Sequence, residues 1–206
     1  MTLSLWLALF AACLMISLTP GAGAINTMTN AMNVGFRRSA WGILGQQTAL
    51  LIQLLIVAAG LGVVIANSPT AFAVIRYTGA AYLGYLGVLQ FLAEPVVARE
   101  DEAPPQPESA RSMFVRGVWV NLLNPKAIVF LLAFIPGFVR PERGLFTQYA
   151  VIGLTLVTVD IVVMWLVFAL LGRSFRRLTS TERGQRNLNR FFGLLFITVG
   201  VLLAVV

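Results

Sequence analysis

The sequence predicts an all-α membrane protein of six transmembrane helices, and three features of its composition support that class. Apolar residues make up 58% of the 206 residues and charged residues 11%, whereas a soluble domain is about 25% charged. The charge-poor stretches approach the length of about 20 apolar residues with which a helix crosses about 30 Å of hydrocarbon. A polar, proline-rich composition occurs in one segment. Little remains for a soluble domain, so the function is expected to lie within the helix bundle.

The expected spans follow the charge-poor stretches in order. The first stretch is as apolar as a secretory signal, but a signal peptide begins with a basic region, and the first Lys or Arg of this chain is Arg37. We therefore interpret it as the first transmembrane helix. The six expected spans cover residues 3–28, 40–66, 70–92, 114–139, 145–172 and 188–206.

The polar segment divides the spans into two groups of three. Residues 94–111 contain four prolines and five acidic residues, and such a segment cannot bury enough apolar area to offset the entropy cost of ordering it. We predict a first three-helix half at residues 1–93, a flexible cytoplasmic linker at residues 94–112 and a second three-helix half at residues 113–206.

A short motif recurs once in each half. Residues 18–21 read LTPG and residues 123–126 read LNPK, which places Pro20 and Pro125 at corresponding positions. Because each half has an odd number of helices, a repeated unit enters the membrane in the opposite orientation the second time. The pattern predicts a 3+3 inverted repeat with interrupted helices 1 and 4, a plan in which transporters bind solute near the bilayer midplane.

The formal charge of +7 is concentrated in loops on one side of the predicted topology. In a soluble protein this excess indicates a nucleic-acid partner, but here the positive-inside rule explains it, so we expect a lipid bilayer and no nucleic acid. The rule places the arginine-rich loops in the cytoplasm and both termini outside the inner membrane. These loops contain Arg37, Arg38, Arg99, Arg111, Arg116, Arg173, Arg176, Arg177, Arg183, Arg186 and Arg190.

The first candidate substrate site consists of Thr19, Pro20, Gly21, Gly23 and Asn26. Proline lacks an amide donor and its ring clashes with the carbonyl four residues back, so Pro20 should free backbone acceptors inside helix 1. Within a membrane, freed backbone groups persist only where protein or a water-filled cavity satisfies them. The segment is therefore expected to line a substrate path; a purely structural kink is the alternative.

The second candidate consists of Asn121, Asn124 and Pro125, with Lys126 beside them near the centre of the fourth span. A lysine at the bilayer centre costs roughly 2.5 to 3.5 kcal/mol on insertion scales. Lys126 is therefore expected to face the bundle interior and to have a partner, although snorkelling to the interface is an alternative. The natural partner is Asp160, the acidic residue that lies well inside a span.

Asp160 and Lys126 are predicted to form an ion pair that carries proton coupling. Pairing lowers the cost of burying both charges, although a buried pair is not in itself evidence of stability. Because intramembrane ionisable groups are functional by default, Asp160 is predicted to gain and lose a proton while Lys126 tunes its proton affinity. The alternative is a static bridge that fixes helix packing.

Gln46 and Gln47 place neutral amides in the second span, and Gln53 lies on nearly the same helix face as Gln46. Such groups can hydrogen-bond a polar solute without selecting a net charge. Hydrogen bonding between helices is the alternative role.

The residues of common reactive sites are missing. The chain contains no histidine and a single cysteine, Cys13, which we interpret as packing, and no cluster of cysteine, histidine and carboxylate at metal-ligand spacing occurs. No nucleophile and base arrangement and no phosphate-binding loop is present. We therefore expect no metal, no cofactor and no enzymatic activity.

Four short segments stand in an order and spacing that is more specific than any one of them. They are residues 18–28 (LTPGAGAINTM), 42–48 (GILGQQT), 79–84 (GAAYLG) and 121–126 (NLLNPK). Together they resemble the LysE/RhtB amino-acid exporter family, and the similarity extends over essentially the whole chain. Within the family, the chain is most similar to the homoserine and homoserine lactone efflux branch.

The resemblance implies a proton-driven exporter of a small amino-acid-like solute in the bacterial inner membrane, in a bundle that can form a homodimer. Family members that export basic amino acids tend to carry an acidic residue in helix 2, where this chain has Gln46 and Gln47. That difference favours a neutral or zwitterionic solute such as homoserine, homoserine lactone or a threonine-like compound. A channel or a non-transporting subunit of a membrane assembly is the alternative.

Overall fold

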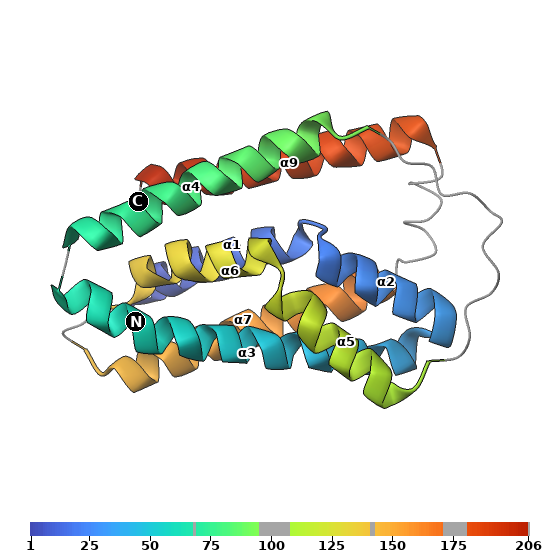
Figure 1. The fold of residues 1–206 in the computed structure, drawn as a ribbon, viewed down its shortest axis with the longest axis horizontal. Coiled ribbons are helices and arrows are strands. Elements are labelled where there is room, and N and C mark those ends of the chain that lie inside the picture. The colour runs from blue at the N-terminus through green and yellow to red at the C-terminus, as the bar shows by residue number, and fades with distance from the viewer. Residues whose placement is uncertain (68, 95–107, 141–142, 171–180, 206) are drawn as a thin grey trace.

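The computed structural model describes residues 1–67, 69–94, 108–140, 143–170 and 181–205, and in these ranges the regular structure is entirely helical (Figure 1). The predicted linker therefore lies largely outside the described residues, as do Arg99, Arg173, Arg176 and Arg177. The helices are α1 (Leu3–Leu18), α2 (Ala22–Val34), α3 (Phe36–Asn67), α4 (Pro69–Leu92), α5 (Ala110–Leu122), α6 (Pro125–Phe134), the 3-10 helix η1 (Ile135–Phe138), α7 (Leu145–Val162), the π-helix η2 (Val163–Ala169) and α9 (Glu182–Val205).

Both predicted helix interruptions are present. The chain bends by 59° between α1 and α2 and by 53° between α5 and α6. Proline cannot donate a backbone hydrogen bond, and Pro20 lies in the first break. At the second break, Pro125 begins α6, where the missing amide costs nothing, and the Asn124 side chain accepts from the backbone nitrogen of Lys126.

The number of spans is only partly reproduced by helix length and hydropathy. Residues 36–60 and 145–169 each satisfy both criteria as single helices, and each bent pair satisfies them when its two helices are joined, which makes up to four spans in the described chain. The expected windows at 70–92 and 188–206 fall on α4 and α9.

The helices pack in a bundle in which α4 and α9 run side by side as one layer (Figure 1). Glycines permit this close approach, because a Cβ on Gly87 would lie 2.8 Å from the backbone oxygen of Gly193. A second close crossing joins α3 to α5, where a Cβ on Gly45 would overlap the backbone oxygen of Phe114. Glycine spacing thus sets where the helices of the two halves meet.

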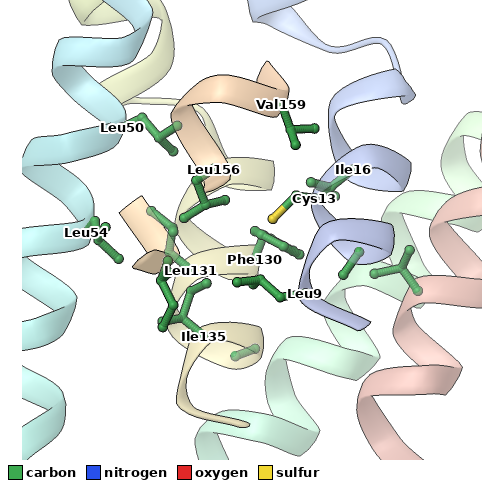
Figure 2. Packing of buried hydrophobic residues seen from close by; sticks show 14 of the residues in the cluster. Leu9, Cys13, Ile16, Leu50, Leu54, Phe130, Leu131, Ile135, Leu156 and Val159 are labelled. Atoms are coloured by element: carbon green, nitrogen blue, oxygen red, sulfur yellow. The ribbon is translucent and has the colours of Figure 1, made fainter. Parts of the chain in front are cut away.

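The apolar core lies between α1, α3, α6 and α7. Leu9 and Cys13 of α1 pack with Phe130 of α6 and Leu156 of α7, and all four side chains are buried (Figure 2). This places Cys13 in the packing role expected for it. The broken helices thus contribute α1 and α6 to the core of the bundle.

The described arginines separate as the alternating loops predicted. The end of α2, the start of α3, the end of α4 and the starts of α5 and α9 lie at one end of the bundle, and the start of α1 and the end of α9 lie at the other (Figure 1). Arg37, Arg38 and Arg183 belong to the first end, whereas Arg140 and Arg143 belong to the α6–α7 connection at the second.

Candidate functional site

A cavity of about 50 Å³ lies between the two helix breaks, α3 and α7, which is room for a few water molecules. Both candidate charged groups line it. Four other predicted site residues join them on its wall: Gly23, Gln46, Asn121 and Asn124.

The carboxylate of Asp160 is held by neutral donors from two other helices. Ser17 of α1 donates from Oγ to Oδ1 at 2.9 Å, and Gln47 of α3 donates from Nε2 to Oδ2 at 2.6 Å. Ser17 and Gln47 are both buried, whereas Asp160 is partly open to the cavity. Each carboxylate oxygen therefore has one protein donor and retains acceptor capacity. Three residues after Asp160, α7 gives way to the π-helix η2, a distortion often found at functional sites.

Lys126 lies in the first turn of α6 and reaches the broken end of α1. Its Nζ donates to the backbone oxygen of Ile16 at 3.0 Å and to that of Thr19 at 2.7 Å. The last carbonyls of a helix have no partner within the helix and carry partial negative charge. Lys126 therefore satisfies two acceptors that the break leaves free, and their dipoles stabilise its ammonium group.

The predicted ion pair between Lys126 and Asp160 is not formed. Among the residues that the structure describes, the salt bridge within 4.0 Å is Arg116 to Glu108 at 2.6 Å, at the arginine-rich end. Lys126 instead uses backbone carbonyls, and Asp160 uses a hydroxyl and an amide. The two opposite charges face the same cavity while each keeps separate partners.

Gln46 and Asn121 connect the first break to the second half. Gln46 donates from Nε2 to the backbone oxygen of Gly23 at 3.2 Å and to Oγ1 of Thr27 at 3.1 Å. Asn121 donates from Nδ2 to the backbone oxygen of Gln46 at 2.9 Å. The amides of these two side chains thus hold α2, α3 and α5 together, and both residues also line the cavity. Hydrogen bonding between helices and contact with the cavity therefore occur in the same residues.

At the second break Gln53 donates to two backbone carbonyls, as Lys126 does at the first. Its Nε2 donates to the backbone oxygens of Asn121 and Leu122, both at 3.1 Å, at the end of α5. The donor for each break therefore comes from the other half of the chain. This reciprocal capping ties the two interrupted helices to the opposite half.

The remaining predicted residues do not all lie on the central cavity. Pro20, Gly21 and Pro125 line a neighbouring hollow of about 260 Å³, which Lys126 also reaches. Thr19 and Asn26 are buried but line neither space; the Thr19 hydroxyl donates to the backbone oxygen of Met15 at 2.8 Å.

Ser17 was not among the predicted site residues, although it binds Asp160 directly. The available signal was a hydroxyl in the last turn before Pro20, next to backbone that the break opens. Serine is ordinary in membrane helices, and its contact with α7 depends on the rotation of α1 against that helix.

Comparison with known proteins identifies the family of this chain. The profile of the LysE type translocators matches residues 14–206. The homoserine/homoserine lactone efflux protein of Salmonella typhi is 40% identical over 204 residues, which cover 99% of this chain and 98% of the relative. The protein of the same name from Salmonella typhimurium is also 40% identical with the same coverage. An uncharacterized membrane protein of Vibrio cholerae is 35% identical over 204 residues, again 99% and 98% of the two chains.

No solved structure matches the chain. A profile match over nearly the whole length, together with full-length relatives at 40% identity, establishes the family without one. This chain belongs to the LysE family of membrane translocators.

Proposed function

We propose that this protein exports a neutral amino acid or a close derivative, such as homoserine, homoserine lactone or a threonine-like solute, across the bacterial inner membrane in exchange for protons. Two relatives of matching length carry homoserine and homoserine lactone efflux in their names. The observation that carries the proposal is the carboxylate of Asp160, which lines a cavity between two helix breaks with neutral hydrogen-bond donors.

Proton exchange is assigned to Asp160 because its charge has no ionic partner within salt-bridge distance among the described residues. A carboxylate locked in an ion pair has little freedom to change its protonation state. Ser17 and Gln47 hold the group in place with neutral bonds that persist in either state. In this proposal a proton that enters from outside neutralises Asp160 and leaves to the cytoplasm while the solute moves outward.

We assign the oxygen atoms of the solute to the part of the cavity wall that the first turn of α2 and Lys126 form. The first turn of α2 has no side-chain cap, and Gly23 and Ala24 of that turn line the cavity. Its free amides form a positive helix end. Lys126 has three donors and uses two of them on α1. A carboxylate or an ester carbonyl suits this wall, and the amides of Gln46, Asn121 and Asn124 suit a polar side chain.

We further propose that all six predicted spans cross the membrane as an inverted repeat of residues 1–93 and 113–206, joined by a cytoplasmic linker at 94–112. The pairs α1–α2 and α5–α6 run in opposite directions along the bundle (Figure 1), as an inverted repeat requires. Reciprocal capping of the two breaks by Lys126 and Gln53 supports the same relation. The arginine-rich end is assigned to the cytoplasm.

Transport into everted vesicles tests the proposal. Homoserine and threonine are expected to accumulate when the lumen is acidic, lysine is not, and Asp160→Asn is expected to abolish the dependence on the gradient. Glu108→Gln, an acid-to-amide change at the arginine-rich end, serves as the matched control and should transport as the wild type does. Undiminished, gradient-dependent export by Asp160→Asn would exclude the carrier role. Wild-type flux that does not depend on the proton gradient would indicate a channel. Absence of flux for every solute would indicate a non-transporting subunit.

A further inference from the structure

Asp160 is the acidic side chain on the wall of the central cavity, and Lys126 is the basic one. The ammonium of Lys126 is engaged by the backbone oxygens of Ile16 and Thr19. Among the described residues, Asp160 accepts from the hydroxyl of Ser17 and the amide of Gln47. The cavity therefore presents a carboxylate that neutral groups orient but no protein cation neutralises at salt-bridge distance among the described residues.

The chemistry of the proposed solutes identifies the group that such a carboxylate suits. Homoserine and threonine are zwitterions, whereas homoserine lactone has an ester in place of the carboxylate. The positive group that all three share is a primary ammonium on the carbon next to the carboxylate or ester group. A site can therefore accept all three through that ammonium, and a buried ammonium requires a carboxylate or several acceptors as its partner.

We propose that Asp160 is the receptor for the primary ammonium of the solute, and that its carboxylate binds either this ammonium or a proton but not both. The inference rests on the proposed export function and adds which solute group the site selects. Ser17 and Gln47 are positioning residues, since each holds one oxygen of Asp160. A carboxylate offers about four lone-pair sites, so acceptor capacity remains after these two bonds.

Competition at one carboxylate is sufficient to produce exchange. When solute meets the protonated carrier, the carboxylic acid of Asp160 loses its proton to water and the carboxylate binds the ammonium, so the total charge is unchanged. When a proton arrives from outside, it neutralises the carboxylate and the ammonium loses its partner. Solutes that carry an ammonium group then move in one direction and protons in the other.

Binding of solutes with and without the ammonium tests the selection. The probes are homoserine lactone and N-acetyl-homoserine lactone, which keeps the ring and the ester but has no ammonium. The purified full-length protein in detergent is expected to bind the acetylated compound roughly 10- to 100-fold more weakly, the factor for a lost charged hydrogen bond. Equal affinity for the two lactones would overturn the inference. Homoserine transport in vesicles together with equal lactone affinity would reject the receptor role while the export function stands.

Proton release on binding tests the competition. Calorimetry of homoserine binding in buffers of different ionisation enthalpy reports the protons released per solute. Release is expected to rise toward one proton as the pH falls, with affinity weakening by up to about tenfold per pH unit. Asp160→Asn should release none and Glu108→Gln should match the wild type. Binding without proton release across the pH series would overturn the shared carboxylate. A wild type that binds none of homoserine, its lactone and threonine would overturn the export function and this inference together.

Ser17→Ala tests the positioning role. Loss of the hydroxyl removes a donor to the carboxylate and thereby favours the protonated form, so homoserine binding should require a higher pH than in the wild type. Ser39→Ala is the matched control, because the Ser39 hydroxyl is buried and donates to the backbone oxygen of Phe36 in its own helix. An unshifted pH profile in Ser17→Ala would remove Ser17 from the site.

Discussion

The Nζ of Lys126 lies 2.7 Å from the backbone oxygen of Thr19, the residue at which the first helix breaks. The cation of α6 thus serves as the missing donor for α1, since Ile16 accepts from the same nitrogen. A lysine within a membrane bundle needs partners because an unpaired charge there is costly. Here the backbone carbonyls at the end of a broken helix supply them.

Lys126→Met should destabilise the protein because it leaves two carbonyls at the end of α1 without a donor. The expected loss is about 1–3 kcal/mol, the cost of buried unsatisfied polar groups. Unfolding of the detergent-solubilised protein measures it. Lys126→Gln keeps an amide donor at the site and should recover part of the stability. A methionine variant as stable as the wild type would show that water can donate to these two carbonyls in place of Lys126.

Gln53→Leu should weaken the second break in the same way, by about 1 kcal/mol, as for hydrogen bonds between membrane helices. The side chain of Gln53 donates to the backbone oxygens of Asn121 and Leu122. Thr48→Val is a control in the same helix, because its hydroxyl donates to the backbone oxygen of Leu44 within that helix. Equal unfolding midpoints for the two variants would contradict the capping role of Gln53.

Gly45→Ala should separate α3 from α5. A Cβ at Gly45 would overlap the backbone oxygen of Phe114, and overpacking of this kind costs about 1–3 kcal/mol. Gly60→Ala lies in the same helix with nothing within 4 Å of the added atom, so it should unfold no earlier than the wild type. If both alanine variants unfold alike, the crossing is looser than these contacts indicate.

Cysteine labelling tests which end of the helix bundle faces the cytoplasm. In a Cys13→Ala background, Arg143→Cys should react with a membrane-impermeant maleimide in cells with a permeabilised outer membrane. Arg37→Cys should react only after the inner membrane is opened, because it lies at the opposite, arginine-rich end (Figure 1). Both arginines are exposed. The reverse pattern would place the arginine-rich end outside.

Local chemistry explains why the helix breaks were predictable. A proline removes its own amide wherever it stands, so Pro20 and Pro125 mark both bends without any knowledge of neighbouring helices. The bilayer class was equally accessible, because 11% charged residues cannot cover an aqueous surface. The boundaries were less accurate, since α2 continues to Val34 and α3 begins at Phe36, beyond the apolar windows.

The partners of the charged groups were predicted wrongly for a physical reason. Opposite charges at similar depth suggested that Lys126 and Asp160 would pair, but direction matters as much as depth. The flexible side chain of Lys126 extends toward the end of α1, whereas Asp160 on α7 accepts hydrogen bonds from Ser17 and Gln47. Which side chain each helix presents depends on its rotation in the packed bundle.

The sequence alone therefore determined that lipid is the solvent, that two helices break at proline, and that a few polar groups lie beside those breaks, because each of these follows from composition or from local backbone chemistry. The tertiary structure decided which donor meets which acceptor. It assigned Lys126 to the carbonyls of α1, Gln53 to those of α5, and two neutral donors to Asp160. Such pairings require distances of about 3 Å between helices far apart in the chain, and only the packing of the bundle sets those distances.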